Sequence, residues 1–319
     1  MSHIRWITAI LLTFIGLLAG PAALSAQTEE PEAPPVPTCD PARPANFGTS
    51  LETLLSDRLE RSYRLYIPES YTGETGAPLV ISLHGFGSNS RQQAEFSQWN
   101  AIAEEVGAVV VYPQGYGMPP RWNAGVIPGG GFTDDVTFIN DLIDHMNASL
   151  CIDPGRVYVN GFSNGGGMSH YLACNLADQI TAVGMVAGAY PTLDLPCEPG
   201  EPVPVIAFHG GADQIVPYDG SGTFFRLPPV DAWAAAWAER NGCDPEPDSE
   251  VIVEGIDRVT YSGCEDNATV VLYTIADGDH TWPGGPRLPL GVGGEPSALV
   301  DATALMWNFF AIYTETSDE

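Results

Sequence analysis

The chain has 319 residues, which is enough for one large domain with a substantial buried core. Its formal net charge is −28, and its 12 basic residues are all arginines. An electrostatic field of this sign opposes binding to nucleic acid and to anionic membranes, so both are excluded as partners.

Residues 1–26 have the composition of a secretory signal peptide. Arg5 gives a short basic start, residues 6–19 form an apolar run, and small residues follow. This pattern predicts cleavage after Ser25 or Ala26 and a secreted protein, either extracellular or periplasmic. The apolar run is too short for a comfortable membrane span, so no membrane anchor is expected.

The rest of the chain divides into two parts by composition. Residues 27–46 are rich in Pro and Glu and are expected to form a flexible tether. Residues 47–319 alternate short apolar runs with helix-like stretches, which is typical of an α/β fold with one mostly parallel sheet covered by helices on both faces. The expected strands are 64–68, 79–84, 108–112, 156–161, 182–187, 203–209 and 269–275. The expected helices are 91–105, 134–148, 164–177, 230–240 and 299–313.

All 6 cysteines lie beyond the signal segment. An even number behind an export signal predicts disulfides, although six cysteines allow about 15 pairings. Cys243 and Cys264 flank a segment rich in Pro and Asp, and they are the expected pair; buried free thiols are the alternative. The chain has no CxxC pair and no HExxH motif, so neither a metal site nor a cofactor is predicted.

The segment Gly161–Gly165 reads Gly-Phe-Ser-Asn-Gly, follows an apolar run and precedes a segment compatible with a helix. In this strand–turn–helix context, a G-x-S-x-G motif forms a nucleophile elbow. The turn is so tight that side chains at the two glycine positions would clash with their surroundings. Ser163 is therefore the candidate nucleophile.

A serine hydroxyl needs an imidazole to accept its proton and a carboxylate to orient that ring. Asp213 and His280 each follow an apolar strand, and the carboxyl ends of parallel strands meet at one edge of a sheet. Their order along the chain after Ser163 is that of an α/β-hydrolase. Asp279 is too close to His280 to be the acid, and residues 134–135 are expected to cap a helix instead.

Structural roles are expected for the four other histidines of the predicted domain. His145 and His170 fall within predicted helices, where packing or surface positions are expected. His84 and His209 end predicted strands near the site, so they are expected to hold loops by hydrogen bonds.

An ester hydrolase also needs hydrogen-bond donors for the oxyanion that develops on the substrate. The strand that ends at Leu83 runs into His84-Gly85-Phe86-Gly87, which is similar to the H-G-rich oxyanion turn of lipases and esterases. The backbone N–H groups of Phe86 and Asn164 are the candidate donors. The alternative is an ordinary turn between a strand and a helix.

Taken together, these motifs resemble the secreted polyhydroxybutyrate depolymerase-like and feruloyl esterase-like branch of the α/β-hydrolase superfamily. The resemblance covers about residues 60 to 312, and its motifs occur in the order of that family. The matching stretches are RSYRLYIP at 61–68, LHGFG at 83–87, RWNAG at 121–125, DDVTFI at 134–139, CIDPGRVYV at 151–159, GFSNGG at 161–166, HGGADQIVPY at 209–218, NGC at 241–243 and GDHTWPGG at 278–285.

This resemblance implies an α/β-hydrolase catalytic domain with Ser163 as nucleophile, Asp213 as acid and His280 as base. It also implies the oxyanion donors at Phe86 and Asn164. Trp122 and Trp282 are candidates for substrate binding, because flat aromatic walls suit a phenolic acid or a polyester unit. Alternatively, Trp282 only packs the loop that carries His280.

The sequence departs from its polymer-cleaving relatives, which often have Cys or Gln in the oxyanion turn, where this chain has Phe86-Gly87-Ser88. It also lacks the cysteines that many relatives carry after Trp122.

The predicted function is a secreted serine carboxylic ester hydrolase that cleaves small or oligomeric esters, of hydroxyalkanoate or feruloyl and aromatic type. A serine peptidase of the same fold and a non-catalytic binding module are the alternatives. The oligomeric state is left open.

Overall fold

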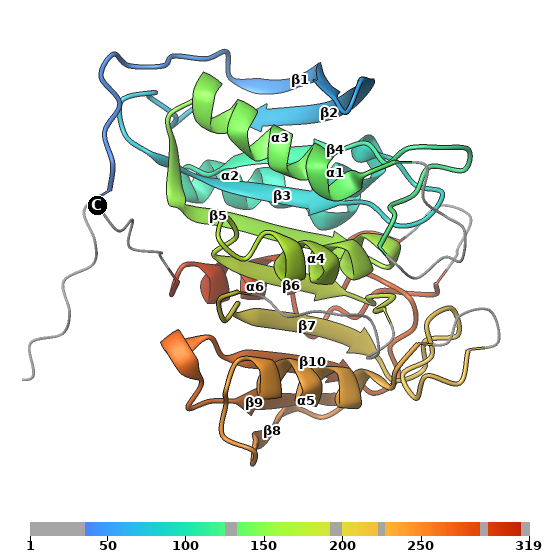
Figure 1. Cartoon of the computed structure of the whole chain (residues 1–319). Coiled ribbons are helices and arrows are strands. Elements are labelled where there is room, and N and C mark those ends of the chain that lie inside the picture. Colours follow the sequence, from blue (N-terminus) through green and yellow to red (C-terminus); the bar gives the residue numbers. More distant parts are fainter. Residues whose placement is uncertain (1–35, 125–132, 192–199, 223–226, 288–292, 314–319) are drawn as a thin grey trace, which may run out of the picture. The chain divides into compact units, whose positions relative to one another are not determined.

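The computed structural model describes residues 36–124, 133–191, 200–222, 227–287 and 293–313, which build one large sheet flanked by helices (Figure 1). The sheet has ten strands in the order β1-β2-β4-β3-β5-β6-β7-β10-β9-β8. The six central strands, from β4 to β10, are parallel, and the strands at both edges are antiparallel. This arrangement confirms the predicted α/β-hydrolase fold.

The strand bounds are β1 Gly48–Ser56, β2 Leu59–Ile67, β3 Ala77–Leu83, β4 Val109–Pro113, β5 Ile152–Phe162, β6 Ala182–Val186, β7 Val205–Gly210, β8 Asp248–Val253, β9 Ile256–Tyr261 and β10 Val270–Ile275. The helices are α1 Ser90–Ser97, α2 Trp99–Val106, α3 Asp135–Ser149, α4 Asn164–Asn175, α5 Val230–Arg240 and α6 Ala302–Phe310. Each predicted strand and helix overlaps an observed one. The predicted helix 91–105 is broken in two, because Gln98 has a φ of 55°, in the left-handed region.

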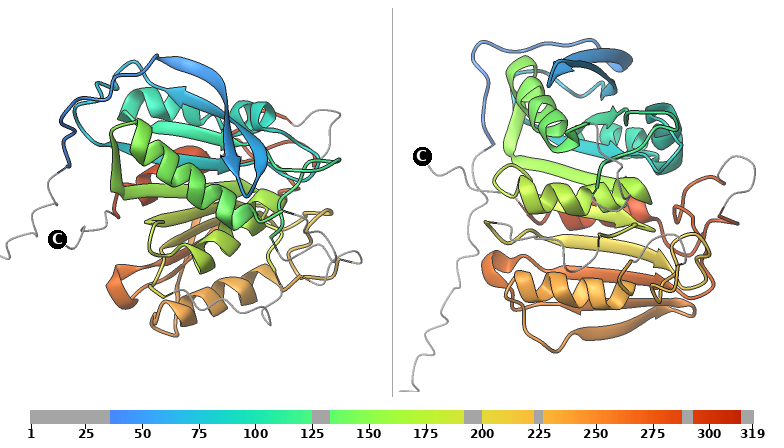
Figure 2. Two further views of the ribbon diagram at one scale, coloured as in Figure 1. Left: turned by 45° about the horizontal axis from the view of Figure 1, so that its top comes forward. Right: turned by 45° about the vertical axis from the view of Figure 1, so that its right-hand side comes forward.

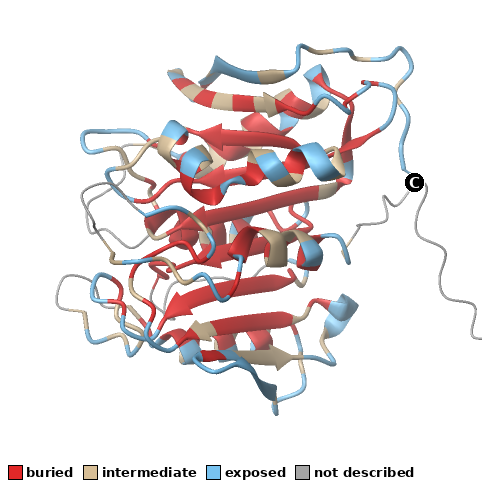
Figure 3. Ribbon diagram, turned by 180° about the vertical axis from the view of Figure 1, so that it is seen from behind, coloured by how far each residue is buried: buried red, intermediate tan, exposed pale blue. Residues whose placement is uncertain are grey.

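The helices form two layers, with α3, α4 and α5 on one face of the sheet and α1, α2 and α6 on the other (Figures 1 and 2). Seen from behind, the central strands are almost entirely buried (Figure 3). Burial on both faces explains why these strands read as continuous apolar runs in the sequence.

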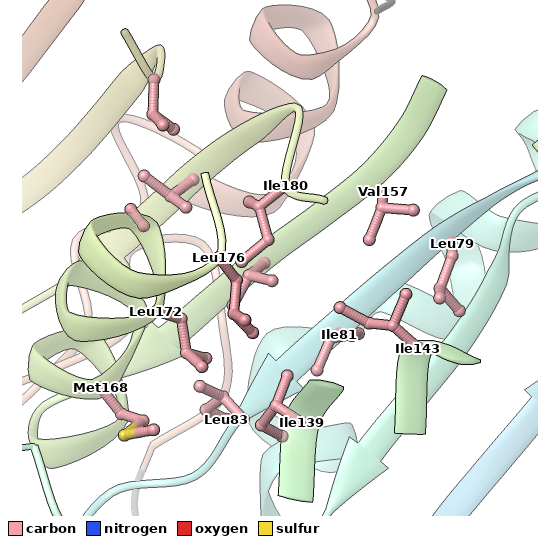
Figure 4. Packing of buried hydrophobic residues seen from close by; sticks show 14 of the residues in the cluster. Leu79, Ile81, Leu83, Ile139, Ile143, Val157, Met168, Leu172, Leu176 and Ile180 are labelled. Atoms are coloured by element: carbon pink, nitrogen blue, oxygen red, sulfur yellow. The ribbon is translucent and has the colours of Figure 1, made fainter. Parts of the chain in front are cut away.

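Alternate residues of the central strands point to opposite faces of the sheet. In β3, Leu79, Ile81 and Leu83 belong to the core under α3 and α4, whereas Val80 belongs to the core on the other side. Figure 4 shows these three residues beside aliphatic side chains of the two helices. Each such fully buried side chain stabilises the fold by about 1.5–3 kcal/mol, so both layers contribute to holding the sheet.

Three strands were not predicted: β1 and β8 at the two edges of the sheet, and β9 next to β8. Their residues are mostly exposed or half-buried, and β8 has no buried residue at all. Since such strands bury little apolar surface, their sequences lack the patterns that reveal the central strands. The segment rich in Pro and Asp between Cys243 and Cys264 contains the β8–β9 hairpin.

The prediction of a flexible tether is wrong for residues 36–46. The Cys39 N–H donates to the Glu74 carbonyl at 2.9 Å, and the Arg43 N–H donates to the Gly73 carbonyl at 2.8 Å. A disulfide between Cys39 and Cys151 fastens the same segment to the start of β5. The ordered domain thus includes residues earlier than 47; the predicted signal peptide and residues 27–35 lie outside the described residues.

The predicted disulfide between Cys243 and Cys264 is confirmed. Cys174 is also in a disulfide, whose other cysteine lies outside the described residues. Among the helices that the structure describes, none is both long and apolar enough to span a bilayer.

Asp134 and Asp135 have different roles, which corrects the prediction that both cap a helix. Asp134 is the N-cap of α3, since its carboxylate accepts the Thr137 N–H at 2.9 Å. Asp135 is buried and forms an ion pair with the buried Arg61 at 2.7 Å. Its second carboxylate oxygen accepts the Asn123 N–H at 2.8 Å. Asp135 therefore ties β2 and the loop that carries residue 122 to the start of α3.

Replacing Asp135 with Ala is expected to lower the free energy of unfolding by about 3–5 kcal/mol, because Arg61 would remain buried and charged without its partner. Glu95→Ala is the matched control, since the Arg91–Glu95 pair is largely exposed and should contribute less than about 1 kcal/mol. Urea unfolding of both variants measures the difference. Equal losses of stability in the two variants would contradict the assigned role of the buried pair.

Candidate active site

Ser163 lies in a sharp turn between β5 and α4, with a φ of 55° and a ψ of −117°. The turn leaves no room for side chains at its glycines. A Cβ atom on Gly161 would lie 2.3 Å from the carbonyl of Gly165, and one on Gly165 would lie 2.3 Å from the carbonyl oxygen of Leu83. The two glycines thus allow β3, β5 and α4 to meet where Ser163 is held in a strained conformation.

Asp213 and His280 lie in the loops that follow β7 and β10, which are neighbouring parallel strands. Their side chains meet, and His280 Nδ1 and Asp213 Oδ2 are 2.7 Å apart. Both residues are buried. Because the ionised carboxylate can only accept a hydrogen bond, Nδ1 carries the proton and Nε2 of the neutral ring is left to act as a base.

The Asp213 carboxylate is held from its other side by the backbone. Its Oδ1 atom accepts the N–H groups of Ile215 and Val216, both at 2.8 Å. Burial on its own raises the pKa of Asp213, but the hydrogen bond and charge of His280, the Val216 N–H and His209 outweigh it and lower the pKa below its usual value. Asp213 therefore stays ionised, which suits the orientation of an imidazole.

The His280 ring lies beside the elbow. Its centroid is 4.8 Å from that of Phe162, the residue directly before Ser163. The structure describes both Ser163 and His280 and has no hydrogen bond between their side chains. Such contacts are often long before substrate binds. The structure therefore brings the three predicted residues to the same edge of the sheet, with the hydrogen bond between His280 and Asp213 formed.

The two candidate oxyanion donors also lie at this edge. Asn164 is the first residue of α4, so its N–H has no acceptor within the helix. Phe86 follows Gly85, at which a Cβ atom would lie 3.4 Å from the Cβ of Ser163. Within the described residues, neither of the two N–H groups has a protein acceptor. Both are thus available to a substrate oxygen close to Ser163.

The structure does not support the prediction that Trp122 and Trp282 wall the substrate pocket. Trp122 is 1% exposed and Trp282 is 2% exposed, so neither indole presents a face to a ligand. Trp122 Nε1 donates to the carbonyl of His84 at 2.8 Å, and Trp282 Nε1 donates to Thr303 Oγ1 at 2.9 Å. These contacts fasten Trp122 to the oxyanion turn and fasten Trp282, with the loop that carries His280, to α6.

His84 and His209 hold loops by hydrogen bonds, as predicted. His84 Nδ1 donates to the Gly85 carbonyl at 2.7 Å, and its Nε2 accepts the Gly115 N–H at 2.9 Å. His209 Nε2 donates to the carbonyl of Val216 at 2.9 Å, which supports the loop that carries the acid. The neutral form of each ring satisfies these contacts.

The role of the Asn164 side chain was not predicted from the sequence. Its Oδ1 accepts the Trp122 N–H at 2.7 Å, and its Nδ2 donates to the Trp122 carbonyl at 3.2 Å. A residue chosen for its backbone N–H therefore also fixes a distant loop through its side chain. In the described part of the chain, no group of three or more His, Cys, Asp or Glu residues could hold a metal ion.

This geometry defines the class of protein as an α/β-hydrolase. The family model described as esterase PHB depolymerase matches residues 61–192, which include the oxyanion turn and the elbow. Among solved structures, the acetyl xylan esterase from Aspergillus awamori matches with a TM-score of 0.57 and 15% identity. That match covers 73% of this chain and 94% of the other, and it shows the shared fold.

Two curated relatives narrow the family further. Feruloyl esterase C of Emericella nidulans is 31% identical over 258 residues, which cover 78% of this chain and 83% of the relative. Feruloyl esterase B of Piromyces equi is 34% identical over 67% of this chain, although the match spans only 41% of that longer protein. The chain belongs to the polyhydroxybutyrate depolymerase-like and feruloyl esterase-like family of carboxylic ester hydrolases.

Three buried histidines predict how stability depends on pH. Burial lowers the pKa of His84 to about 4 and that of His170 to about 3, and it also lowers the pKa of His209. In the unfolded chain each ring protonates near its reference pKa of about 6.5. Below that pH the unfolded state binds more protons than the folded state, so stability is lost as the pH falls from about 6.5 towards 4.

The three histidines together are expected to reduce the free energy of unfolding by up to about 4 kcal/mol per pH unit in that window. Urea unfolding at a series of pH values measures the slope. His170→Asn removes one of the three groups and should make the slope shallower by about 1.4 kcal/mol per pH unit. An unchanged slope in this variant would contradict the assignment.

Proposed function

We propose that this chain is a serine carboxylic ester hydrolase that works through an acyl-enzyme on Ser163. The observation that carries the proposal is the hydrogen bond between His280 Nδ1 and Asp213 Oδ2, 2.7 Å long and buried beside the elbow. A carboxylate that fixes this tautomer leaves Nε2 unprotonated, so that it can accept the proton that a serine nucleophile must lose.

The reaction proceeds in two halves. Ser163 Oγ attacks the ester carbonyl while His280 Nε2 takes the hydroxyl proton, and the resulting oxyanion accepts the N–H groups of Phe86 and Asn164. The tetrahedral intermediate collapses as His280 returns the proton to the leaving alcohol. Water then attacks the acyl-enzyme with His280 again as base, which releases the acid and restores Ser163. Asp213 stays ionised throughout.

Replacing Ser163 with Ala is expected to lower kcat for a short-chain nitrophenyl ester by about 10⁴-fold or more, because the residual catalysis comes from the oxyanion donors and binding alone. Initial rates on equal amounts of folded protein measure the loss. A fluorophosphonate probe should label the wild type at Ser163 and leave the variant unlabelled. Near-full turnover by Ser163→Ala would remove this residue from the mechanism.

The proposed substrates are small or oligomeric esters of hydroxyalkanoate or of feruloyl and aromatic type. The polyhydroxybutyrate depolymerase family and the feruloyl esterase relatives support these two acyl classes. Phe86 is 54% exposed, and it follows Gly85, at which a Cβ atom would lie 3.4 Å from the Cβ of Ser163. An exposed apolar side chain is thus available to an acyl group near the nucleophile. The two alternatives, a serine peptidase and a binding module, predict amide cleavage and no turnover, respectively.

A panel of substrates separates these possibilities. Methyl ferulate, hydroxybutyrate oligomers and short nitrophenyl esters should be hydrolysed, with the soluble oligomers cleaved faster than a crystalline polyester film. Measured kcat/KM values rank the acyl classes, and a peptide amide of similar size is the control. Faster attack on the film or on the amide would overturn the substrate proposal.

We further propose that the protein is secreted, extracellular or periplasmic. The apolar segment at residues 6–19 and the disulfides Cys39–Cys151 and Cys243–Cys264 support export to an oxidising compartment. The intact mass of the exported protein should be that of a chain beginning at Ala26 or Gln27. A full-length, uncleaved chain retained in the cytoplasm would contradict secretion.

A further inference from the structure

We propose that Trp122 is a positioning residue that holds the two oxyanion donors at a fixed separation. This inference rests on the serine esterase function proposed above. It differs from the role in substrate contact that the sequence suggested, because the indole is buried. The backbone N–H, the backbone carbonyl and the indole N–H of Trp122 all bind Asn164 or His84, beside the two candidate donors.

The first donor is attached to Trp122 through the Asn164 side chain. One carboxamide binds both backbone groups of Trp122, with Oδ1 accepting the N–H at 2.7 Å and Nδ2 donating to the carbonyl at 3.2 Å. Asn164 is 5% exposed, so water competes little for these contacts. The backbone N–H of the same residue is the oxyanion donor at the start of α4. The position of this donor is thus coupled to that of Trp122.

The second donor is attached to Trp122 through His84. Trp122 Nε1 donates to the His84 carbonyl at 2.8 Å, and the His84 ring donates from Nδ1 to the Gly85 carbonyl at 2.7 Å. That carbonyl belongs to the same planar peptide unit as the Phe86 N–H. In a trans peptide the C=O and N–H groups point in opposite directions, so a bond on the carbonyl fixes where the N–H points. His84 therefore orients the second donor.

Trp122 itself has little freedom to move. It is 1% exposed, its ring centroid is 5.1 Å from that of His84, and the N–H of the next residue, Asn123, donates to the buried carboxylate of Asp135 at 2.8 Å. Arg61 completes the support through its ion pair with that carboxylate. Hydrogen bonds therefore connect Asn164 and His84, which carry or orient the two oxyanion donors, to Trp122. Trp122 is in turn held by the buried ion pair between Asp135 and Arg61.

The consequence is kinetic. Oxyanion donors act only when each lies about 2.7–3.1 Å from the developing negative charge, and losing one costs about 10²–10³-fold in kcat. If the indole N–H is removed, the turn from His84 to Phe86 is released while Asn164 stays in place. The transition state then loses part of one donor, whereas the binding of the ground-state ester is little affected.

Trp122→Phe is the test, because it keeps an aromatic ring and removes the indole N–H. We expect kcat for a short nitrophenyl ester to fall by about 10-fold to 100-fold with KM changed by less than about 3-fold. The affinity for an alkyl boronic acid, whose serine adduct is tetrahedral, should fall by a similar factor. Loss of kcat with unchanged affinity for the boronic acid would overturn the proposal.

Trp237→Phe is the matched control. Trp237 is also fully buried, and its Nε1 donates to a backbone carbonyl, that of Val203, at 3.0 Å. Val203 precedes β7 and therefore lies at the end of the strand opposite to Asp213. The control should lose a similar amount of thermal stability and keep kcat within about 2-fold. Equal losses of kcat in both variants would show that Trp122 acts only through general stability.

A second variant keeps the proposal testable if Trp122→Phe does not fold. Asn164→Ala retains the backbone donor and breaks the contact with Trp122, and it should also lower kcat and boronic acid affinity together. Both contacts belong to the same hydrogen-bonded chain through Trp122. The fold-loss of kcat in the Trp122→Phe/Asn164→Ala double variant should therefore be smaller than the product of the fold-losses in the two single variants. Fully multiplicative losses would overturn the coupling. If the wild type neither turns over esters nor labels at Ser163, the proposed function fails first, and that result is distinct from these.

Discussion

The site depends on how closely β3, β5 and α4 approach one another. At Gly165 even a methyl group would lie within 2.3 Å of the Leu83 carbonyl, and at Gly161 it would lie within 2.3 Å of Gly165. This contact between backbones places the nucleophile, the start of α4 and the oxyanion turn after β3 within one small region. The same packing that buries β3 on both faces therefore assembles half of the candidate active site.

The acid and the base are positioned by a separate set of contacts. They lie in the loops that follow β7 and β10, which pair with each other, and the Asp213 loop is held by its own backbone N–H groups and by His209. Nothing in this half needs the strained turn at Ser163. The two halves meet where the Phe162 ring packs against His280 and Trp282, so these ring contacts set how the loop that carries the base approaches the elbow.

The sequence was most informative where one physical requirement has few solutions. Central strands must be apolar on both faces, and the elbow needs glycines, so β3 to β7, β10 and Ser163 could be predicted from residue types alone. Asp213 could be predicted as the acid because it lies just beyond the carboxyl end of a strand. Exposed edge strands such as β8 have no such requirement, and their pairing depends on neighbours that are remote in the chain.

Trp122 shows the opposite limit. A tryptophan in a Gly-rich loop near a site has the same sequence signature whether it faces a ligand or is buried, because the difference lies in acceptors more than 30 residues away. Residues 36–46 are a similar case. Their composition indicates a free segment, yet Cys39 finds its partner 112 residues further along the chain. The composition of a segment indicates how much apolar surface it can bury on its own. It says little about the disulfides and hydrogen bonds that distant segments form with it.

The large negative charge of the chain has limited influence on this chemistry. At physiological ionic strength, exposed charges more than about 8 Å away are largely screened, whereas a buried pair is screened much less. The carboxylate that binds the His280 ring is that of Asp213, 2.7 Å away, and its other oxygen accepts two backbone N–H groups. Local donors and burial therefore govern the site, while the acidic surface governs what can approach the protein from a distance.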